Sequence, residues 1–311
     1  MKNKFLLFIA VSVLLFSFSL TSTLGFSIGE KTFNRIKSPN SRKYFSIPIT
    51  ISPEGHIFIK AKINGVEGRF ILDTGAGINV ITKKFASKLN DVIPLDGTFT
   101  GFRATGEKLN MKLFSVKNIE IGNLIIHNNI LTILYADFGK FDGLISMTCF
   151  RNQPFTIDFP NKKIYLETKK SLNVRMKKGK IVPIQLDDDR GISLDLFTKV
   201  KVNNKLILQI SLDSGAGFDV FRFNAGFMNK LGIDSSNAKK YSKKSSINKE
   251  ISNAFYISNV KDIFLYSAPS VHDENVKASF LKGLIYDGIT CINWLGKQVT
   301  IDIPDKEMIL N

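Results

Sequence analysis

Two short segments of the sequence share a pattern of residue types that can do chemistry. Residues 73–76 read Asp-Thr-Gly-Ala and residues 213–216 read Asp-Ser-Gly-Ala, and each segment follows an apolar run. A carboxylate in such a position is costly to ionise unless it is hydrogen-bonded, and the hydroxyl residue and glycine turn that follow are suited to hold it. A single Asp-Ser/Thr-Gly is common by chance, whereas two in matching contexts mark a candidate site.

The chemistry of this pair depends on Asp73 and Asp213 meeting. Two carboxyls within hydrogen-bond distance cannot both ionise cheaply, so one keeps a proton while the other stays charged. The charged carboxylate can take a proton from a bound water, and the protonated one can polarise a peptide carbonyl and later help protonate the leaving amine. This mechanism requires no metal ion and no cofactor. Support is expected from the residues that follow each aspartate, Thr74, Gly75, Ser214 and Gly215.

The elements that would position these residues are themselves repeated. Segments 141–146 and 286–291 are both built around Asp-Gly, and segments 155–166 and 299–310 share an Ile-Asp-x-Pro core. A repeat on this scale indicates one fold unit of about 130 residues used twice. We therefore expect two lobes related by a pseudo-two-fold axis.

Local patterns predict a mostly β fold. Runs of Val, Ile, Phe and Thr are interrupted by Gly and Asn throughout the chain. Residues 56–63 and 196–202 each predict the first strand of a hairpin that feeds a motif strand. A short helix is expected after each motif, at residues 83–89 behind a Thr82 cap and at residues 224–231.

The two motifs resemble those of aspartic proteases, most closely the retropepsin-like group, whose Asp-Thr/Ser-Gly-Ala form they match. The resemblance covers about residue 46 to the end of the chain. It implies the two-lobed pepsin/retropepsin-like acid protease fold, with Asp73 and Asp213 as the catalytic residues. In that family a second element of each lobe, two apolar residues and a glycine after an Asp-Gly or Asn-Gly, supports the catalytic loop. Here the two glycine positions hold Ser146 and Cys291.

Members of that family cover the cleft with a hairpin flap. Residues 98–107, with Gly101, Phe102 and Gly106, occupy the corresponding place in the first lobe, and residues 242–253 are their counterpart in the second. An ordinary surface hairpin is the alternative for either segment.

The N-terminus has the features of an export signal. Lys2 and Lys4 precede an apolar stretch over residues 5–20, and small residues follow near residue 25. An uncleaved membrane anchor is the alternative, although the run is short for a span. In either case we expect the folded part outside the cytoplasm, in the periplasm or the extracellular space. The expected organisation is a signal peptide over 1–25, a lead segment over 26–45, an N-terminal lobe over 46–168, a junction over 169–180 and a C-terminal lobe over 181–311.

The chain is basic, with a formal net charge of +16. Such a charge can attract nucleic acid or anionic envelope polymers. The lysines are scattered along the predicted strands and turns, however, as on a solvated surface. We therefore do not expect nucleic acid as a partner.

The remaining reactive residue types give weaker signals. Cys149 and Cys291 could bridge the lobes, but two buried thiols are favoured for a chain with so few cysteines. Residues 187–189 form a run of three aspartates without calcium-loop spacing and are expected to be a solvated turn. The histidines lack a nucleophile signature and are expected on the surface or in the core, at His56, His127 and His272.

The sequence therefore predicts an exported, monomeric aspartic endopeptidase that acts on a polypeptide. One alternative is a non-catalytic module of the same fold that binds extended peptide or an envelope polymer. Another is a protease whose halves pair with other molecules, which the duplication within one chain makes unnecessary. Ala76 and Ala216 cannot donate a hydrogen bond to the carboxylates, so we expect optimal activity between about pH 4.5 and 7, above that of pepsin-type enzymes.

Overall fold

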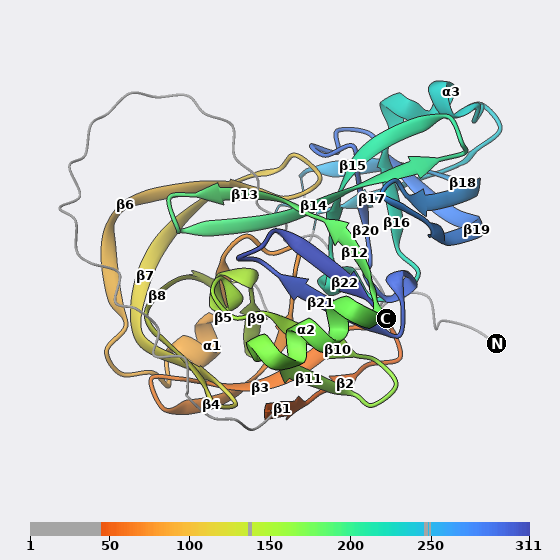
Figure 1. The fold of residues 1–311 in the computed structure, drawn as a ribbon. Helices are drawn as coiled ribbons and strands as arrows, with labels where there is room; N and C mark the ends of the chain where they lie inside the picture. The colour runs from red at the N-terminus through yellow and green to blue at the C-terminus, as the bar shows by residue number, and fades with distance from the viewer. Residues whose placement is uncertain (1–44, 136–138, 246–247, 249) are drawn as a thin grey trace.

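The computed structural model describes residues 45–135, 139–245, 248 and 250–311. Within these residues the chain forms two β lobes with a third sheet between them (Figure 1). None of the helices in this part of the chain is long and apolar enough to cross a membrane. The predicted signal peptide and all but the last residue of the predicted lead segment lie outside the described residues.

The first lobe is an eight-stranded sheet that delivers Asp73. Strand β3 buries every second side chain, which is the pattern of a strand with one face on the core. It forms the predicted hairpin with β4, and β4 then pairs in parallel with β9. In spatial order the strands are β2 (Thr50–Ile51), β3 (Ile57–Ile63), β4 (Val66–Leu72), β9 (Gly143–Ile145), β5 (Asn79–Thr82), β8 (Leu124–Leu134), β7 (Lys108–Ile121) and β6 (Ile93–Phe102).

The second lobe repeats this sheet strand for strand. The hairpin of β14 and β15 delivers Asp213, and β15 pairs in parallel with β20. The identical order confirms the mostly β, two-lobed fold with pseudo-two-fold symmetry. In the same spatial order the strands are β13 (Gln185–Asp189), β14 (Ser193–Val202), β15 (Leu206–Leu212), β20 (Gly288–Thr290), β16 (Phe221–Asn224), β19 (Ala268–Leu281), β18 (Ser252–Leu265) and β17 (Lys239–Lys244).

A six-stranded sheet joins the two lobes. Its central pair is antiparallel, and Thr156 lies opposite Thr300 with the two hydroxyls 2.7 Å apart. Each lobe contributes three strands, so the sheet makes the lobes one structural unit. In spatial order they are β1 (Phe45–Pro48), β11 (Lys163–Leu166), β10 (Phe155–Asp158), β21 (Gln298–Asp302), β22 (Glu307–Leu310) and β12 (Lys180–Pro183).

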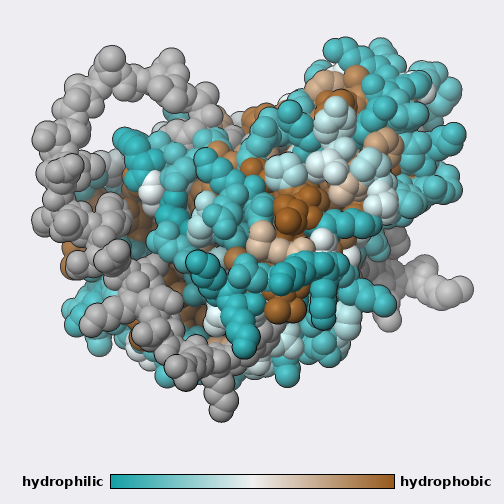
Figure 2. Space-filling view, viewed as in Figure 1, coloured by the Kyte–Doolittle hydropathy of each residue, from teal (hydrophilic) through white to brown (hydrophobic). Residues whose placement is uncertain are grey.

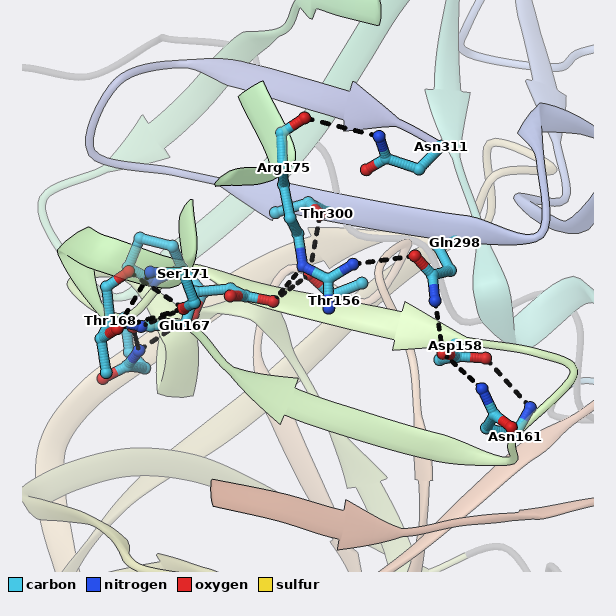
Figure 3. Close-up of polar contacts among 12 residues, drawn as sticks. Thr156, Asp158, Asn161, Glu167, Thr168, Ser171, Arg175, Gln298, Thr300 and Asn311 are labelled. Atoms are coloured by element: carbon cyan, nitrogen blue, oxygen red, sulfur yellow. Dashed lines mark hydrogen bonds and ion pairs between the residues drawn. The ribbon is translucent and has the colours of Figure 1, made fainter. Parts of the chain in front are cut away.

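The predicted junction contains a helix, α2 (Lys169–Lys178), which begins with a capping box at Thr168. Its Arg175 forms an ion pair with Glu167 and donates to the Gln298 side chain at 2.9 Å (Figure 3). Gln298 in turn donates to Asp158 at 2.5 Å, so this polar chain links the helix to strands of both lobes. The domain boundaries themselves stay a prediction.

Two short helices follow the motifs at the expected places. Helix α1 (Lys83–Ala86) begins behind Thr82, whose hydroxyl accepts from the Phe85 N–H at 3.1 Å. Helix α3 (Met228–Leu231) ends at Gly232, which adopts the left-handed conformation that favours glycine at a helix end. Both are shorter than predicted.

The aspartate run at 187–189 is not the solvated turn that we expected. These residues close strand β13, which pairs with β14 at the edge of the second lobe, and the turn begins only at Arg190. The prediction was wrong because three consecutive acidic residues disfavour a strand locally, whereas pairing with a neighbouring strand overrides that preference.

One apolar core cluster runs through both lobes and the joining sheet. Two smaller clusters lie beside it, one with residues of β5, β6 and β7 and the other with residues of β14, β18 and β19. Hydrophilic residues cover most of the face shown in Figure 2. Both smaller clusters include residues of the hairpin formed by β6 and β7.

Candidate active site

Asp73 and Asp213 stand at equivalent ends of the paired strands. The N–H of Asp73 donates to the Ile145 carbonyl at 2.9 Å, and the N–H of Asp213 donates to the Thr290 carbonyl at 2.8 Å. These matching bonds persist although Ser146 and Cys291 stand where the resembling family has glycine. The backbone at the start of each aspartate turn is therefore anchored in the same way in both lobes.

The structure brings the two carboxyls together. Asp73 is 3% exposed and Asp213 is 2% exposed, and a side-chain hydrogen bond joins them. Gly215 lies so close to Asp73 that a Cβ at that position would sit 2.4 Å from the carboxyl carbon. Residue 215 must therefore be glycine for the carboxyls to meet. The N–H of Gly75 donates to Asp73 Oδ1 at 3.0 Å.

Thr74 and Ser214 lock the two motif turns to each other. The Thr74 N–H donates to Ser214 Oγ at 3.0 Å, and the Ser214 N–H donates to Thr74 Oγ1 at 2.9 Å. Each hydroxyl then donates to a carbonyl of the opposite lobe, Thr74 to Leu212 and Ser214 to Leu72, both at 2.7 Å. All four bonds are buried, which fixes the relative position of the aspartates.

The environment gives the two carboxyls different acidities. Burial, and then the charge of Asp213, raise the pKa of Asp73 well above its ordinary value. Burial also raises the pKa of Asp213, to about 6, while the charge of Arg222 opposes that rise. These shifts favour a state with one proton on the pair, held by Asp73 and shared with charged Asp213.

Arg222 is a charged residue of the site that sequence reasoning missed. It lies on β16 and is partly buried. Its own pKa is lowered by burial and raised again by the charge of Asp213, which reports the proximity of the two groups. Val80 stands at the corresponding place in the first lobe, because it lies opposite Leu144 as Arg222 lies opposite Ile289, so the two lobes differ in charge at this position.

The first hairpin, β6 and β7, reaches the second lobe with its turn. Gly101 is buried, Phe102 is half-buried and Gly106 is exposed. The Ile285 N–H donates to the carbonyl of Ala104, in the turn, at 3.1 Å. At Gly106, whose φ is +82°, a Cβ would approach the Gly283 carbonyl to 3.0 Å, so glycine permits both the turn and the contact.

The tips of the two hairpins also meet each other. Arg103 and Glu107 form an ion pair at 2.8 Å with side chains 5% and 3% exposed. Ser245, at the end of the second hairpin strand β17, accepts from Arg103 at 2.6 Å and donates to Glu107 at 2.7 Å. Part of the second segment, residues 246–247 and 249, lies outside the described residues.

The other candidate residues take structural places. Cys149 and Cys291 are free, buried thiols, so the alternative of a bridge between the lobes was wrong. His56 is partly buried, and burial lowers its pKa. His127 and His272 are exposed. In the described part of the chain, no three His, Cys, Asp or Glu side chains gather closely enough to hold a metal ion.

Comparison with known proteins gives one family match. Residues 59–149 match the family model described as Aspartyl protease, a segment that includes Asp73. No curated protein matches the chain. Among solved structures, a retropepsin-like aspartic protease from Rickettsia conorii is similar at 22% sequence identity and a TM-score of 0.29, over 40% of this chain and 90% of that one. The family match on the first lobe, with its strand order and aspartate turn repeated around Asp213, supports a retropepsin-like aspartic protease.

Proposed function

We propose that the protein is an exported aspartic endopeptidase in which Asp73 and Asp213 together activate a water molecule. The observation that carries the proposal is the hydrogen bond between two buried carboxyls at the ends of equivalent strands. A structural role alone does not account for two buried acids in contact, because each raises the cost of ionising the other.

In the proposed mechanism Asp213 is the base and Asp73 is the acid. Asp213 is the more acidic of the two because Arg222 favours its charged form. It takes a proton from the attacking water, while protonated Asp73 donates to the carbonyl oxygen of the scissile peptide bond. The proton taken by Asp213 then passes to the leaving nitrogen, and Asp73 recovers its proton from the collapsing gem-diol.

The proposal includes a single chain as the working unit, since one chain supplies both aspartates and both locking hydroxyls. The substrate is a polypeptide. The basic N-terminal residues and the apolar stretch after them support export by a signal peptide. An uncleaved anchor would instead keep the protein on a membrane.

The test is cleavage of neutral peptides by the purified protein between pH 3 and 8, followed by mass spectrometry. Asp73→Asn and Asp213→Asn should each remove nearly all cleavage, because paired catalytic groups act as a unit. Asp305→Asn, at an exposed turn, is the matched control and should keep wild-type activity. Circular dichroism should show an intact fold in all three variants.

Three outcomes would contradict the proposal. Substantial activity in either Asn variant would show that the aspartates do not form one site. Tight peptide binding by the wild type without cleavage at any pH would favour the non-catalytic binding module. A product trapped by added hydroxylamine would point to a covalent acyl intermediate, which this mechanism does not form.

A further inference from the structure

Asp195 is a buried carboxyl that the proposed mechanism does not use. It lies on β14, is 2% exposed, and its Oδ1 has no hydrogen-bond partner in the described part of the chain. Burial, and then the charge of Asp187, raise its pKa well above the ordinary value. A buried, unpartnered carboxyl destabilises a fold, so its presence here requires an explanation other than stability.

Asp195 belongs to a pair of acids on neighbouring strands. It lies directly opposite Asp187 in the pairing of β13 with β14. Side chains in such opposed positions share one face of the sheet with their Cβ atoms about 5 Å apart. A group bound to exposed Asp187 would therefore lie within reach of Asp195.

The two acids that follow Asp187 in the sequence differ from this pair because each forms an ion pair with an arginine. Asp188 forms an ion pair with Arg151, and Asp189 forms one with Arg190 at 3.2 Å. Asp187 has no such partner among the described residues, and the charges of Asp189 and Asp188 contribute to its raised pKa. Three consecutive acids thus include two that are neutralised and one that is available.

The start of β14 lies against the turn that carries Asp73. The Leu194 N–H donates to the carbonyl of Gly77, four residues after Asp73, at 2.8 Å. Ile192 packs against the apolar cluster that includes Ile78 and residues of the first hairpin. Figure 1 shows the β13–β14 hairpin extending from the second lobe toward β6 and β7.

The same strand also lies near the place where the first hairpin docks. Phe197, two residues after Asp195 on the same face of β14, packs in the cluster that includes Ala104 of the hairpin turn. A cavity of about 400 Å³ opens beside it and is lined by Asp187, Phe197 and Ile285. Ile285 is the residue that binds the Ala104 carbonyl, so the cavity adjoins the hairpin tip.

We propose that Asp187 and Asp195 form an acidic subsite that binds a cationic side chain, lysine or arginine, of the polypeptide substrate. The inference rests on the proposed function for the identity of the ligand as a peptide. A metal ion is disfavoured because two carboxylates supply too few ligands and no third His, Cys, Asp or Glu among the described residues completes a cluster. An ammonium or guanidinium group, in contrast, needs only one or two carboxylates.

The physical basis is a change in the charge of Asp195 when a cationic ligand binds. Without a ligand, burial and then the charge of Asp187 favour the neutral form of its carboxyl by raising its pKa. A cationic side chain favours the ionised form of Asp195 and satisfies its unpartnered oxygen, with release of a proton. An apolar side chain of equal length can do neither, so the subsite discriminates between the two.

The test measures binding separately from cleavage. Eight octapeptides, each with one lysine at a different position and no other charged side chain, are compared with their norleucine counterparts by calorimetry against the Asp213→Asn variant. We expect lysine to bind at least about tenfold more tightly than norleucine at one position. Adding Asp195→Asn should bring this ratio close to one, and adding Asp187→Asn should reduce it. Glu274→Gln, which removes a carboxylate with a side chain 68% exposed on β19, should keep the ratio.

The outcomes separate this inference from the proposed function. Equal binding of lysine and norleucine at every position, or a lysine preference that survives Asp195→Asn, would overturn the subsite even if the wild type cleaves neutral peptides. A lysine preference that depends on both aspartates would support it even if no peptide is cleaved. Because Asn is nearly isosteric with a protonated Asp, Asp195→Asn should fold, and the exposed Asp187→Asn gives an independent reading.

Discussion

Thr74 and Ser214 are reciprocal partners across the lobe boundary, since the hydroxyl of each accepts a hydrogen bond from the N–H of the other. Each hydroxyl also donates to a carbonyl just before the opposite aspartate. The geometry of the catalytic pair is thus tied to bonds that run between the lobes rather than within them.

Replacing Thr74 with Val should remove one accepting and one donating hydroxyl contact while keeping the shape of the side chain. Because it leaves the N–H of Ser214 and the carbonyl of Leu212 buried without partners, we expect a loss of about 2 to 4 kcal/mol in unfolding free energy. Urea denaturation measures this loss, and peptide cleavage should fall as well. Thr74→Ser keeps the hydroxyl and should restore most of both properties. Equal stability of the Val and Ser variants would show that these bonds do not hold the turns.

Arg222→Met should shift the acidic limb of the pH–activity profile to higher pH. The charge of Arg222 lowers the pKa of Asp213, so its removal raises that pKa, and the carboxylate needed as base is lost at a higher pH as the solution is acidified. Arg222→Lys retains the positive charge and should keep the limb nearer to its wild-type position. Profiles of kcat/KM with a neutral peptide measure the effect. An unchanged acidic limb in the Met variant would show that Arg222 does not lower the pKa of Asp213.

Glu107→Gln should destabilise the contact between the two hairpin tips. The substitution leaves the guanidinium of Arg103 buried without its carboxylate, and breaking a buried pair in this way typically costs about 3 to 5 kcal/mol. The double variant Arg103→Met/Glu107→Leu removes both charges and should be milder. Thermal unfolding and hydrogen exchange in the hairpin turn measure the difference. A double variant less stable than the single one would argue against this account.

Cys149 and Cys291 should be unreactive toward thiol reagents in the native protein. Both are buried, and burial raises the pKa of both thiols to about 12, so almost no thiolate exists at pH 8. Both should react fully in denaturant, and a reducing agent should leave the melting temperature unchanged. Rapid labelling of either thiol under native conditions would contradict the structure.

The sequence predicted the features that depend on local pattern or on the repeat. Alternation in residues 57–63 indicated a strand with one buried face, and Thr82 marked the start of a helix by its capping chemistry. The placement of Asp73 beside Asp213 followed from matching the two halves of the chain. Two equivalent lobes related by a pseudo-two-fold axis bring their equivalent residues together, so the repeat predicted this long-range contact.

The features that the sequence did not reveal are contacts between unlike residues far apart in the chain. Arg222 influences Asp213 only because β16 lies beside β20, and nothing in its neighbouring residues signals this. The ion pair of Arg103 and Glu107 has ordinary local spacing, and its burial depends on Ser245 of the other lobe. No local propensity encodes such contacts.

The joining sheet has a consequence for how the protein is made. Synthesis runs from the N-terminus, so the first lobe is complete long before β21 exists, and the edge of β10 then has no hydrogen-bonding partner. Because the pairing is symmetric about Thr156 and Thr300, the edge that normally receives β21 is also complementary to β10 of a second nascent chain. Two incompletely folded copies that lie close together therefore risk pairing through their β10 edges, and rapid pairing of β10 with β21 of the same chain protects against this misassembly.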